Sequence, residues 1–569
     1  MALKTSQSKF SLKLMVHKGE SRVIFAEVDS HFVDTLFSIM TLPMATILRL
    51  LQKHSDESLK EIGSINNLYE SLTNLSTNCL SSEENKWLLL NPRTSAYDLC
   101  TKLKVNVDDS EPLKYYICDN IICSRRSGAL FSTCNVARCN RCGISRMDWE
   151  IKDEDSDDES GGDRLDGGVF VSDVASFIVT DDLRVMPNAS GCTIQLLRDL
   201  GINDVSELEN RTFDIGRDQM LILLKGALLC KYPLTYMVFG TTGIATELVN
   251  TEKLASAKQT SKDTTTGSKT LKLKVTLQKS AFKFLFAEAD SNFVEFLFGF
   301  LEIPLGRMIG KLMDGASPFE SLNNLYASIS SMSVGEYVKS SYLKSMLLES
   351  DLVMKHLSVN QIFPLYVSSA SKSYCHSYLK NETYCAYRTE HVMRKVLKDE
   401  MFTSIILKDP RVEGCYLNKS AKFMLTDDLV ISLSSAMSSI AMLGKLKVPL
   451  NDVEEHTVTI GVEEGLKLLE ASFKSSSTLT DALLEKGHEA EKNVNKIAVK
   501  ADKQKGILLS YMEKRTFDSD IRSLTGTVTP PPLPPPPAVT VTFVDNTAAA
   551  TPRHHPAPLP PSPLHCVGK

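Results

Sequence analysis

Four cysteines within 25 residues have the types and spacing of a metal site: Cys118, Cys123, Cys139 and Cys142. Four residues separate the first pair, two separate the second pair, and fifteen lie between the pairs. Such a pattern can place four thiolates tetrahedrally around zinc. Gly143 follows the second pair and allows a tight backbone turn there. The spacing therefore predicts a zinc-ribbon-like unit over 112–147 that holds one structural zinc ion, with Cys134 left over.

Two other interpretations of these cysteines stay open. They could be small buried residues of a reduced protein, although their density in the sequence argues against it. The Cys139-x-x-Cys142 pair could also be a redox motif. That role needs a strand before the pair and a helix after it. The flanking residues do not favour such a junction.

The corresponding part of the second half of the chain has lost the pattern. Ala370 stands where Cys118 does, when Pro364 is aligned with Pro112. Nearby metal-binding types remain, but at no recognisable spacing: Cys375, His376, Cys385 and His391. We therefore expect no zinc in the second half, and a structural rather than catalytic role for zinc in the first.

The elements around these cysteines belong to a unit that occurs twice in the sequence. RVIFAEVDSHFVDTLF at 22–37 returns 261 positions later as KFLFAEADSNFVEFLF at 283–298, with nine of sixteen letters identical. NNLY at 66–69 returns at 323–326, and TDDL at 180–183 returns at 426–429. The offset falls from 261 to 257 to 246, which indicates a tandem duplication of a whole module with small deletions.

Each copy is predicted to open with a β-hairpin that leads into a helix. Residues 11–16 alternate between apolar and polar, Lys18-Gly19 favours a turn, and 22–28 reads as a second strand. Asp29 and, in the second copy, Asp290 can cap the following helix. A catalytic carboxylate pair in FAEADS is an alternative, but a strand end and a cap explain these acids without chemistry.

The later part of each copy has a different pattern of residues. Residues 177–183 and 423–429 each indicate a strand that enters a turn, and a mostly helical stretch is expected to follow. The fold class is therefore predicted to be α+β, with two tandem homologous modules and the zinc-ribbon-like insert in the first.

The predicted boundaries follow shifts in composition: 8–250 for the first copy with an acidic loop at 153–163, 251–269 for a linker, 270–485 for the second copy, 486–524 for a charged helical segment and 525–569 for a proline-rich disordered tail. Ser156 and Ser160 in the acidic loop are candidate phosphorylation sites. In the tail, Pro531, Pro532, Leu533 and Pro534 form a candidate ligand for polyproline-recognising domains.

Composition limits the classes of protein. A net charge of −5 over 569 residues argues against a general nucleic-acid binder. No signal peptide or membrane span is indicated, so the thirteen cysteines are expected to be reduced and the protein cytoplasmic or nuclear. The final Cys566-Val567-Gly568-Lys569 fits a prenylation box poorly.

These segments together resemble a plant family catalogued as domain of unknown function 674. The likeness rests on residues 11–43, on NNLYESL, LLNPRTS and KYYICDNIIC, and on FIVTDDLRVMP and FMLTDDLVIS. It covers roughly residues 8–485. The resemblance implies a plant protein with this module in tandem, and it implies no activity.

Three functions remain after the familiar catalytic motifs prove absent from the sequence. The leading hypothesis is a non-enzymatic interaction or scaffold protein with unidentified protein partners. The second is a zinc-dependent nucleic-acid or chromatin factor that contacts phosphate through Arg125, Arg126, Arg138, Arg141 and Arg146. The neighbouring acidic loop argues against it. The third is an enzyme of unrecognised type.

Overall fold

The computed structural model describes residues 8–484 except 55–61, 112–113, 125, 127, 144–145, 154–167, 173–175, 189–191, 241–268, 353–359, 366–373, 380–381 and 388–401. Several predictions concern residues outside this part of the chain. They are the acidic loop beyond Asp153, the linker up to 268, the charged segment 486–524 and the tail 525–569 with Pro531 to Pro534. These stay predictions.

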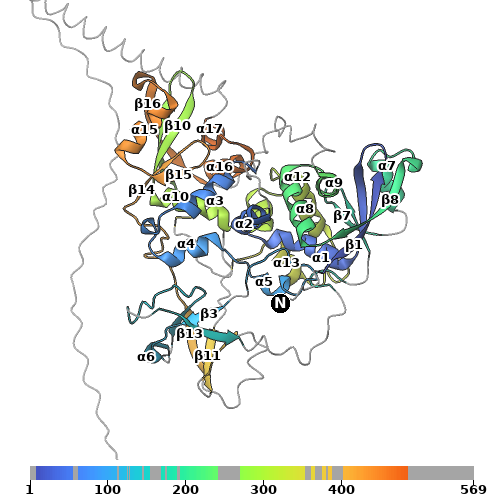
Figure 1. Cartoon of the computed structure of the whole chain (residues 1–569), viewed down its shortest axis with the longest axis horizontal. Helices are drawn as coiled ribbons and strands as arrows, with labels where there is room; N and C mark the ends of the chain where they lie inside the picture. The colour runs from blue at the N-terminus through green and yellow to red at the C-terminus, as the bar shows by residue number, and fades with distance from the viewer. Residues whose placement is uncertain are drawn as a thin grey trace, which may run out of the picture. The chain divides into compact units, whose positions relative to one another are not determined.

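Two five-stranded antiparallel sheets have the same strand order (Figure 1). In the first half of the chain (8–250) the order is β7 (Val185–Pro187), β6 (Phe177–Thr180), β2 (Arg22–Val28), β1 (Phe10–His17) and β8 (Leu208–Ile215). In the second half (270–485) it is β15 (Ile431–Leu433), β14 (Lys422–Leu425), β10 (Lys283–Asp290), β9 (Leu271–Gln278) and β16 (Val453–Ile460). The predicted α+β class is confirmed.

The opening hairpin forms for the reasons that the sequence suggests. In β1, Phe10, Leu12 and Leu14 are buried while Ser11 and Lys13 are exposed, so one face of the sheet enters the core. Asp29 caps the next helix by accepting a hydrogen bond from the amide of Phe32 at 2.8 Å. Asp290 caps the equivalent helix of the second half in the same way.

Helices pack against both sheets. Those of the first half are α1 (Ser30–Ser38), α2 (Met44–His54), α3 (Ile65–Asn74), α4 (Glu83–Leu90), α5 (Tyr97–Cys100), α6 (Ile121–Ser124), α7 (Cys192–Asp199), α8 (Arg217–Leu229) and α9 (Pro233–Phe239). Those of the second half are α10 (Ser291–Glu302), α11 (Leu305–Arg307), α12 (Glu320–Ser331), α13 (Ser341–Leu348), α15 (Ala436–Leu446), α16 (Val462–Lys474) and α17 (Thr478–Leu483).

The expectation of a mostly helical stretch after TDDL is wrong in part. An eight-residue strand, β8 or β16, interrupts the helices in each half and pairs along the whole of β1 or β9. Both strands lie at a sheet edge, and most of their side chains are exposed or half-buried. Their sequences therefore lack the apolar alternation that marks a half-buried strand, and the pairing partner is distant in the chain.

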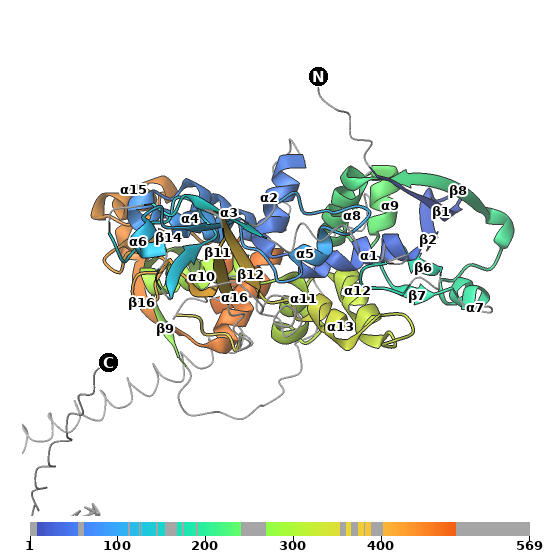
Figure 2. The ribbon, with the colours of Figure 1, turned by 90° about the horizontal axis from the view of Figure 1, so that it is seen from below.

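The two halves exchange helices. The side-chain amide of Asn67 on α3 donates to the carbonyl of Asp428 in the second half at 2.8 Å. The equivalent Asn324 on α12 donates to the carbonyl of Asp182 in the first half at 2.9 Å. Figure 1 accordingly places α3 beside the second-half sheet, and Figure 2 places α12 toward the first-half strands. The repeated NNLY and TDDL segments thus meet across the halves.

Further contacts between the two halves also occur in equivalent pairs. The hydroxyl of Ser71 accepts from the amide of Ile431 at 2.9 Å, and that of Ser328 accepts from the amide of Val185 at 3.0 Å. Single β-bridges join Leu80 to Leu417 and Val171 to Val338. Pro43 also bridges its own counterpart, Pro304. One hydrophobic cluster runs through both halves, and the described residues form one compact unit.

Neither half is expected to fold cooperatively alone, because α3 and α12 would each lose the surface that they cover. Residues 1–250 and 251–569 expressed separately should show broad thermal transitions by circular dichroism. Co-expressed, they should form a complex that elutes together from a sizing column and melts in one transition. A sharp transition in either isolated piece would contradict the exchange.

A buried acid fixes the TDDL turn of the first half. Asp181 accepts hydrogen bonds from the amide and hydroxyl of Thr235, at 2.8 and 2.5 Å. The same hydroxyl accepts from the amide of Val23 at 2.9 Å, so the turn, α9 and β2 are linked. Burial raises the pKa of Asp181 to about 7, although Thr235 and Arg22 oppose the rise.

This raised pKa predicts a pH dependence of stability. Between about pH 4 and 7 the folded protein binds the Asp181 proton and the unfolded chain does not, so stability falls as pH rises. As pH falls from about 7 to about 4, wild type should therefore gain unfolding free energy relative to Asp181→Asn. Urea unfolding at several pH values measures it. Parallel curves would contradict the assignment.

A six-stranded closed barrel is shared by the two halves. The first half supplies β3 (Tyr115–Ile117), β4 (Ala129–Ser132) and β5 (Trp149–Asp153), and the second supplies β11 (Tyr374–Leu379), β12 (Glu382–Tyr387) and β13 (Phe402–Leu407). Parallel pairings of β5 with β12 and of β4 with β13 close the ring. The four candidate ligands lie on the first-half side of this barrel.

Candidate metal centre

Two tight turns bring the four cysteines together. Cys118 directly follows β3, and Cys123 lies in α6. Asn120 shapes this first turn: its side chain accepts from the amide of Ile122 and its carbonyl from the amide of Cys123, both at 2.9 Å. Strand β3 therefore leads directly into the first cysteine pair.

The second turn contains Cys139 and Cys142 and ends at Gly143. The amide of Gly143 donates to the carbonyl of Cys139 at 2.9 Å, and the φ of Gly143 is +69°. A residue with a side chain would be strained in this left-handed conformation. The described residues that follow, 146–153, contain no helix, so they do not provide the flank that a thioredoxin-like redox pair needs.

The sulfur positions fit one ion. The four Sγ atoms all lie within 4.8 Å of one another, and those of Cys118 and Cys142 are 3.7 Å apart. Four sulfurs at about 2.3 Å from a tetrahedral zinc would be about 3.8 Å apart. The four predicted residues therefore form one cluster, which is compatible with a metal ion.

Burial and proximity make the cluster costly to ionise without a cation. Cys118 and Cys139 are buried, and Ala137 and Met147 pack against them. Burial raises the pKa of the Cys118 thiol far above its usual value, and the neighbouring thiols Cys142 and Cys139 raise it further. A bound dication would reverse this balance and favour the thiolates.

The other sequence candidates lie apart from the cluster. Cys134 is buried outside it, as expected for the residue left over, and burial raises its pKa to about 11. Cys375 and Cys385 lie within β11 and β12 rather than in turns. Ala370 and His391 are outside the described residues. None of the nine described cysteines forms a disulfide.

Sequence reasoning missed the buried ion pair that connects the barrel to α4. The ammonium of Lys408, just after β13, lies 2.5 Å from a carboxylate oxygen of Glu84. Their side chains are 5% and 2% exposed. Ser132 on β4 donates to the other carboxylate oxygen at 2.6 Å. No sequence signal could have paired residues 324 positions apart.

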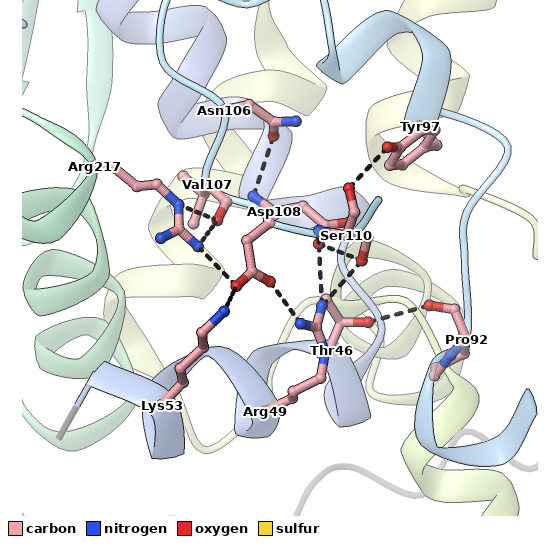
Figure 3. Close-up of polar contacts among 11 residues, drawn as sticks. Thr46, Arg49, Lys53, Pro92, Tyr97, Asn106, Val107, Asp108, Ser110 and Arg217 are labelled. Carbon is pink, nitrogen blue, oxygen red and sulfur yellow. Dashed lines mark hydrogen bonds and ion pairs between the residues drawn. The ribbon is translucent and has the colours of Figure 1, made fainter. Parts of the chain in front are cut away.

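A second polar cluster, drawn in Figure 3, clamps the loop at 106–110. Arg49 and Lys53 on α2 reach Asp109 at 2.5 and 2.7 Å. Arg217 on α8 donates to the carbonyl of Val107 at 3.0 Å. Although burial opposes it, the Lys53 and Arg49 hydrogen bonds hold the pKa of Asp109 below its usual value. The basic side chains form ion pairs with the aspartate of the loop, which indicates a structural clamp.

Buried acids with raised pKa are the usual places to look for catalysis. Burial raises the pKa of Asp34 on α1 to about 6. Its carboxylate nevertheless accepts from the amides of Phe170 and Val171 at 2.9 and 2.8 Å. The equivalent Glu295 on α10 accepts from the amide of Leu417 at 2.7 Å. Both acids serve as anchors for backbone that leads to the later strands.

Comparison with protein families identifies the chain. A family model described as a protein of unknown function (DUF674) matches residues 6–463. The chain belongs to the DUF674 family. The match takes in the cysteine cluster and both sheets, so the resemblance seen in the sequence is confirmed.

Other comparisons add no named relative to this DUF674 protein. No curated protein and no solved structure matches the chain. Among the described helices, none has the length and apolar character needed to cross a bilayer.

Proposed function

We propose that this DUF674 protein is a non-enzymatic interaction or scaffold protein of the plant cytosol or nucleus. The observation that carries the proposal is the outer face of α15. Met437 and Ile440 on that face are 75% and 65% exposed, and no residue of the helix is fully buried. A helix with apolar residues on opposite faces is normally covered on both of them.

The first half provides a comparison within the same molecule. There α7 lies against Ile24 and Phe25 of the sheet, as α15 lies against Leu285 and Phe286. At an offset of 246, Gln195 and Arg198 of α7 correspond to Ala441 and Gly444 of α15. The outer face is therefore more polar in the first half and apolar in the second. An exposed apolar patch of this kind is typical of a protein-binding surface.

The cysteine cluster has a supporting role in this proposal. Four converging thiols at the end of a three-residue strand are the donor set of a structural zinc site, with no place left for substrate. The residues Cys118, Cys123, Cys139 and Cys142 would hold the ion and stabilise the first-half side of the barrel.

Affinity purification from plant extract tests the proposal. The baits are the full-length protein, residues 1–524 without the tail, and Met437→Glu/Ile440→Glu. Full-length protein should enrich specific proteins. One set should be lost without Pro531 to Pro534, if polyproline-recognising domains bind there, and another set should be lost from the α15 variant. No enrichment over a control bait in any arm would refute the interaction role.

A nucleic-acid role remains the second candidate because the arginines near the cysteines are exposed. Arg126, Arg138, Arg141 and Arg146 are all at the surface, and an isolated bridge pairs Arg138 with Arg146. Arg125 lies outside the described residues. Salt-dependent binding of a labelled RNA or DNA to the full chain, lost in Arg138→Ser/Arg141→Ser, would favour this function.

A further inference from the structure

Exposed apolar residues also flank α15 on both sides in the sequence. Leu433, at the end of β15 before the helix, is 52% exposed. Leu450, which follows the helix after Pro449, is 78% exposed. In the middle of the stripe, an added Cβ at Gly444 would meet no atom within 4 Å. The exposed apolar residues thus span 433–450 in the sequence, and at Gly444 another backbone could approach closely.

Lysines flank this surface at both ends. Lys422 lies beside its N-terminal end, where its carbonyl accepts from the amide of Ser434 at 2.9 Å. Lys445 and Lys447 lie at the C-terminal end of α15. All three are exposed, and no ion pair among the described residues includes them.

The nearby acids are already engaged. Asp452 accepts from the amide and hydroxyl of Ser280, at 2.9 and 2.6 Å. Asp427 accepts from the amide and hydroxyl of Thr480, at 2.8 and 2.7 Å. Lys279 also acts on the charge of Asp452 and Lys283 on that of Asp427, so these two acids do not match the three lysines of the surface.

We infer that this surface binds an amphipathic helix of a partner protein whose apolar face is bordered by acidic residues. The inference rests on the proposed interaction role and names the chemistry of the partner. The apolar stripe would bury the partner's aliphatic side chains, and the three lysines would pair with its carboxylates. Positions i, i+3, i+4 and i+7 of α15, from Met437 to Gly444, match the stripe of such a helix.

A second copy of the chain is a poorer occupant. A two-fold contact through α15 would place the lysine-bordered faces of both copies against each other. Like charges would then meet at the edge of the contact, which opposes association. A helix with acidic borders meets the same surface with complementary charge.

The test uses two fluorescein-labelled synthetic helices and the full-length protein. Both peptides carry leucine at i, i+3, i+4 and i+7; one has glutamate at the bordering positions and the other has lysine. By fluorescence anisotropy, the glutamate peptide should bind and the lysine peptide should not. Met437→Glu/Ile440→Glu should weaken binding about tenfold or more, because the buried apolar area is lost. Lys445→Glu/Lys447→Glu should reverse the preference between the peptides.

Ile194→Glu on α7 is the matched control. Ile194 occupies the position of Ile440 at the 246 offset and is 62% exposed, so its replacement should leave peptide binding unchanged. Circular dichroism melts should be unaltered in every variant, since the replaced side chains are exposed.

Equal loss of binding in Ile194→Glu, or equal binding of both peptides, would overturn the inference. So would a dimer in sedimentation velocity that Met437→Glu/Ile440→Glu abolishes, because the face would then join two copies. If neither peptide binds while affinity purification still enriches proteins that the α15 variant loses, the acidic-bordered helix is rejected as partner and the interaction role stands.

Discussion

Full-length protein should contain about one equivalent of zinc, and replacing Cys118, Cys123, Cys139 or Cys142 by serine should remove nearly all of it. Each serine takes away one of four thiolates, and a hydroxyl is a poor replacement as a zinc ligand. Elemental analysis of the purified proteins measures the metal. The whole chain is the right material, because the barrel strands beside the cluster come from both halves.

Loss of zinc should also loosen the barrel. Burial raises the pKa values of the Cys118 and Cys123 thiols. Without the ion, the four cysteines would no longer hold the two turns together. Hydrogen exchange should therefore rise across 115–153 and in the paired strand β13. A chelator should reproduce this change in wild type. The two sheets should keep their protection, since their core does not include the cysteine cluster.

Two cysteines serve as controls for the metal assignment. Cys134→Ser and Cys375→Ser should both retain zinc, because Cys134 lies outside the cluster and Cys375 belongs to β11. Wild-type protein without metal, or a second equivalent that depends on Cys375, would show the assignment to be wrong.

Replacing Lys408 by methionine should lower the free energy of unfolding by about 3–5 kcal/mol. The substitution leaves the carboxylate of Glu84 buried with only the Ser132 hydroxyl as a described side-chain partner. An uncompensated buried charge costs far more than the loss of an ion pair in water. Urea unfolding of the full chain, followed by circular dichroism, measures the difference.

The matched control is an ion pair on the surface. Lys467 lies 3.0 Å from Glu463 on α16, with 44% and 68% of their side chains exposed. Lys467→Met should cost about 0.5 kcal/mol or less. Replacing both buried partners, as Glu84→Leu/Lys408→Met, should recover most of the stability, because no charge then remains buried. Similar losses at the two sites would contradict the burial of Lys408.

Local sequence was sufficient for the hairpin, the caps and the cysteine cluster. Alternating residues define β1, the carboxylate of Asp29 finds an amide three residues away, and each cysteine pair lies within one turn. These features depend on neighbours in the chain, so spacing reveals them. The edge strands β8 and β16 were missed because their exposed side chains show little apolar alternation and their partners are far away.

The sequence by itself determined that two equivalent sets of elements exist, and only the tertiary structure decided how they combine. Asn67 and Asn324 stand in the same local sequence, as do Asp182 and Asp428, so packing within a half and exchange between halves would make the same contacts. Repeated letters cannot distinguish these arrangements. The choice rests on long-range packing, which places α3 on the second-half sheet, α12 on the first, and three strands from each half in one barrel.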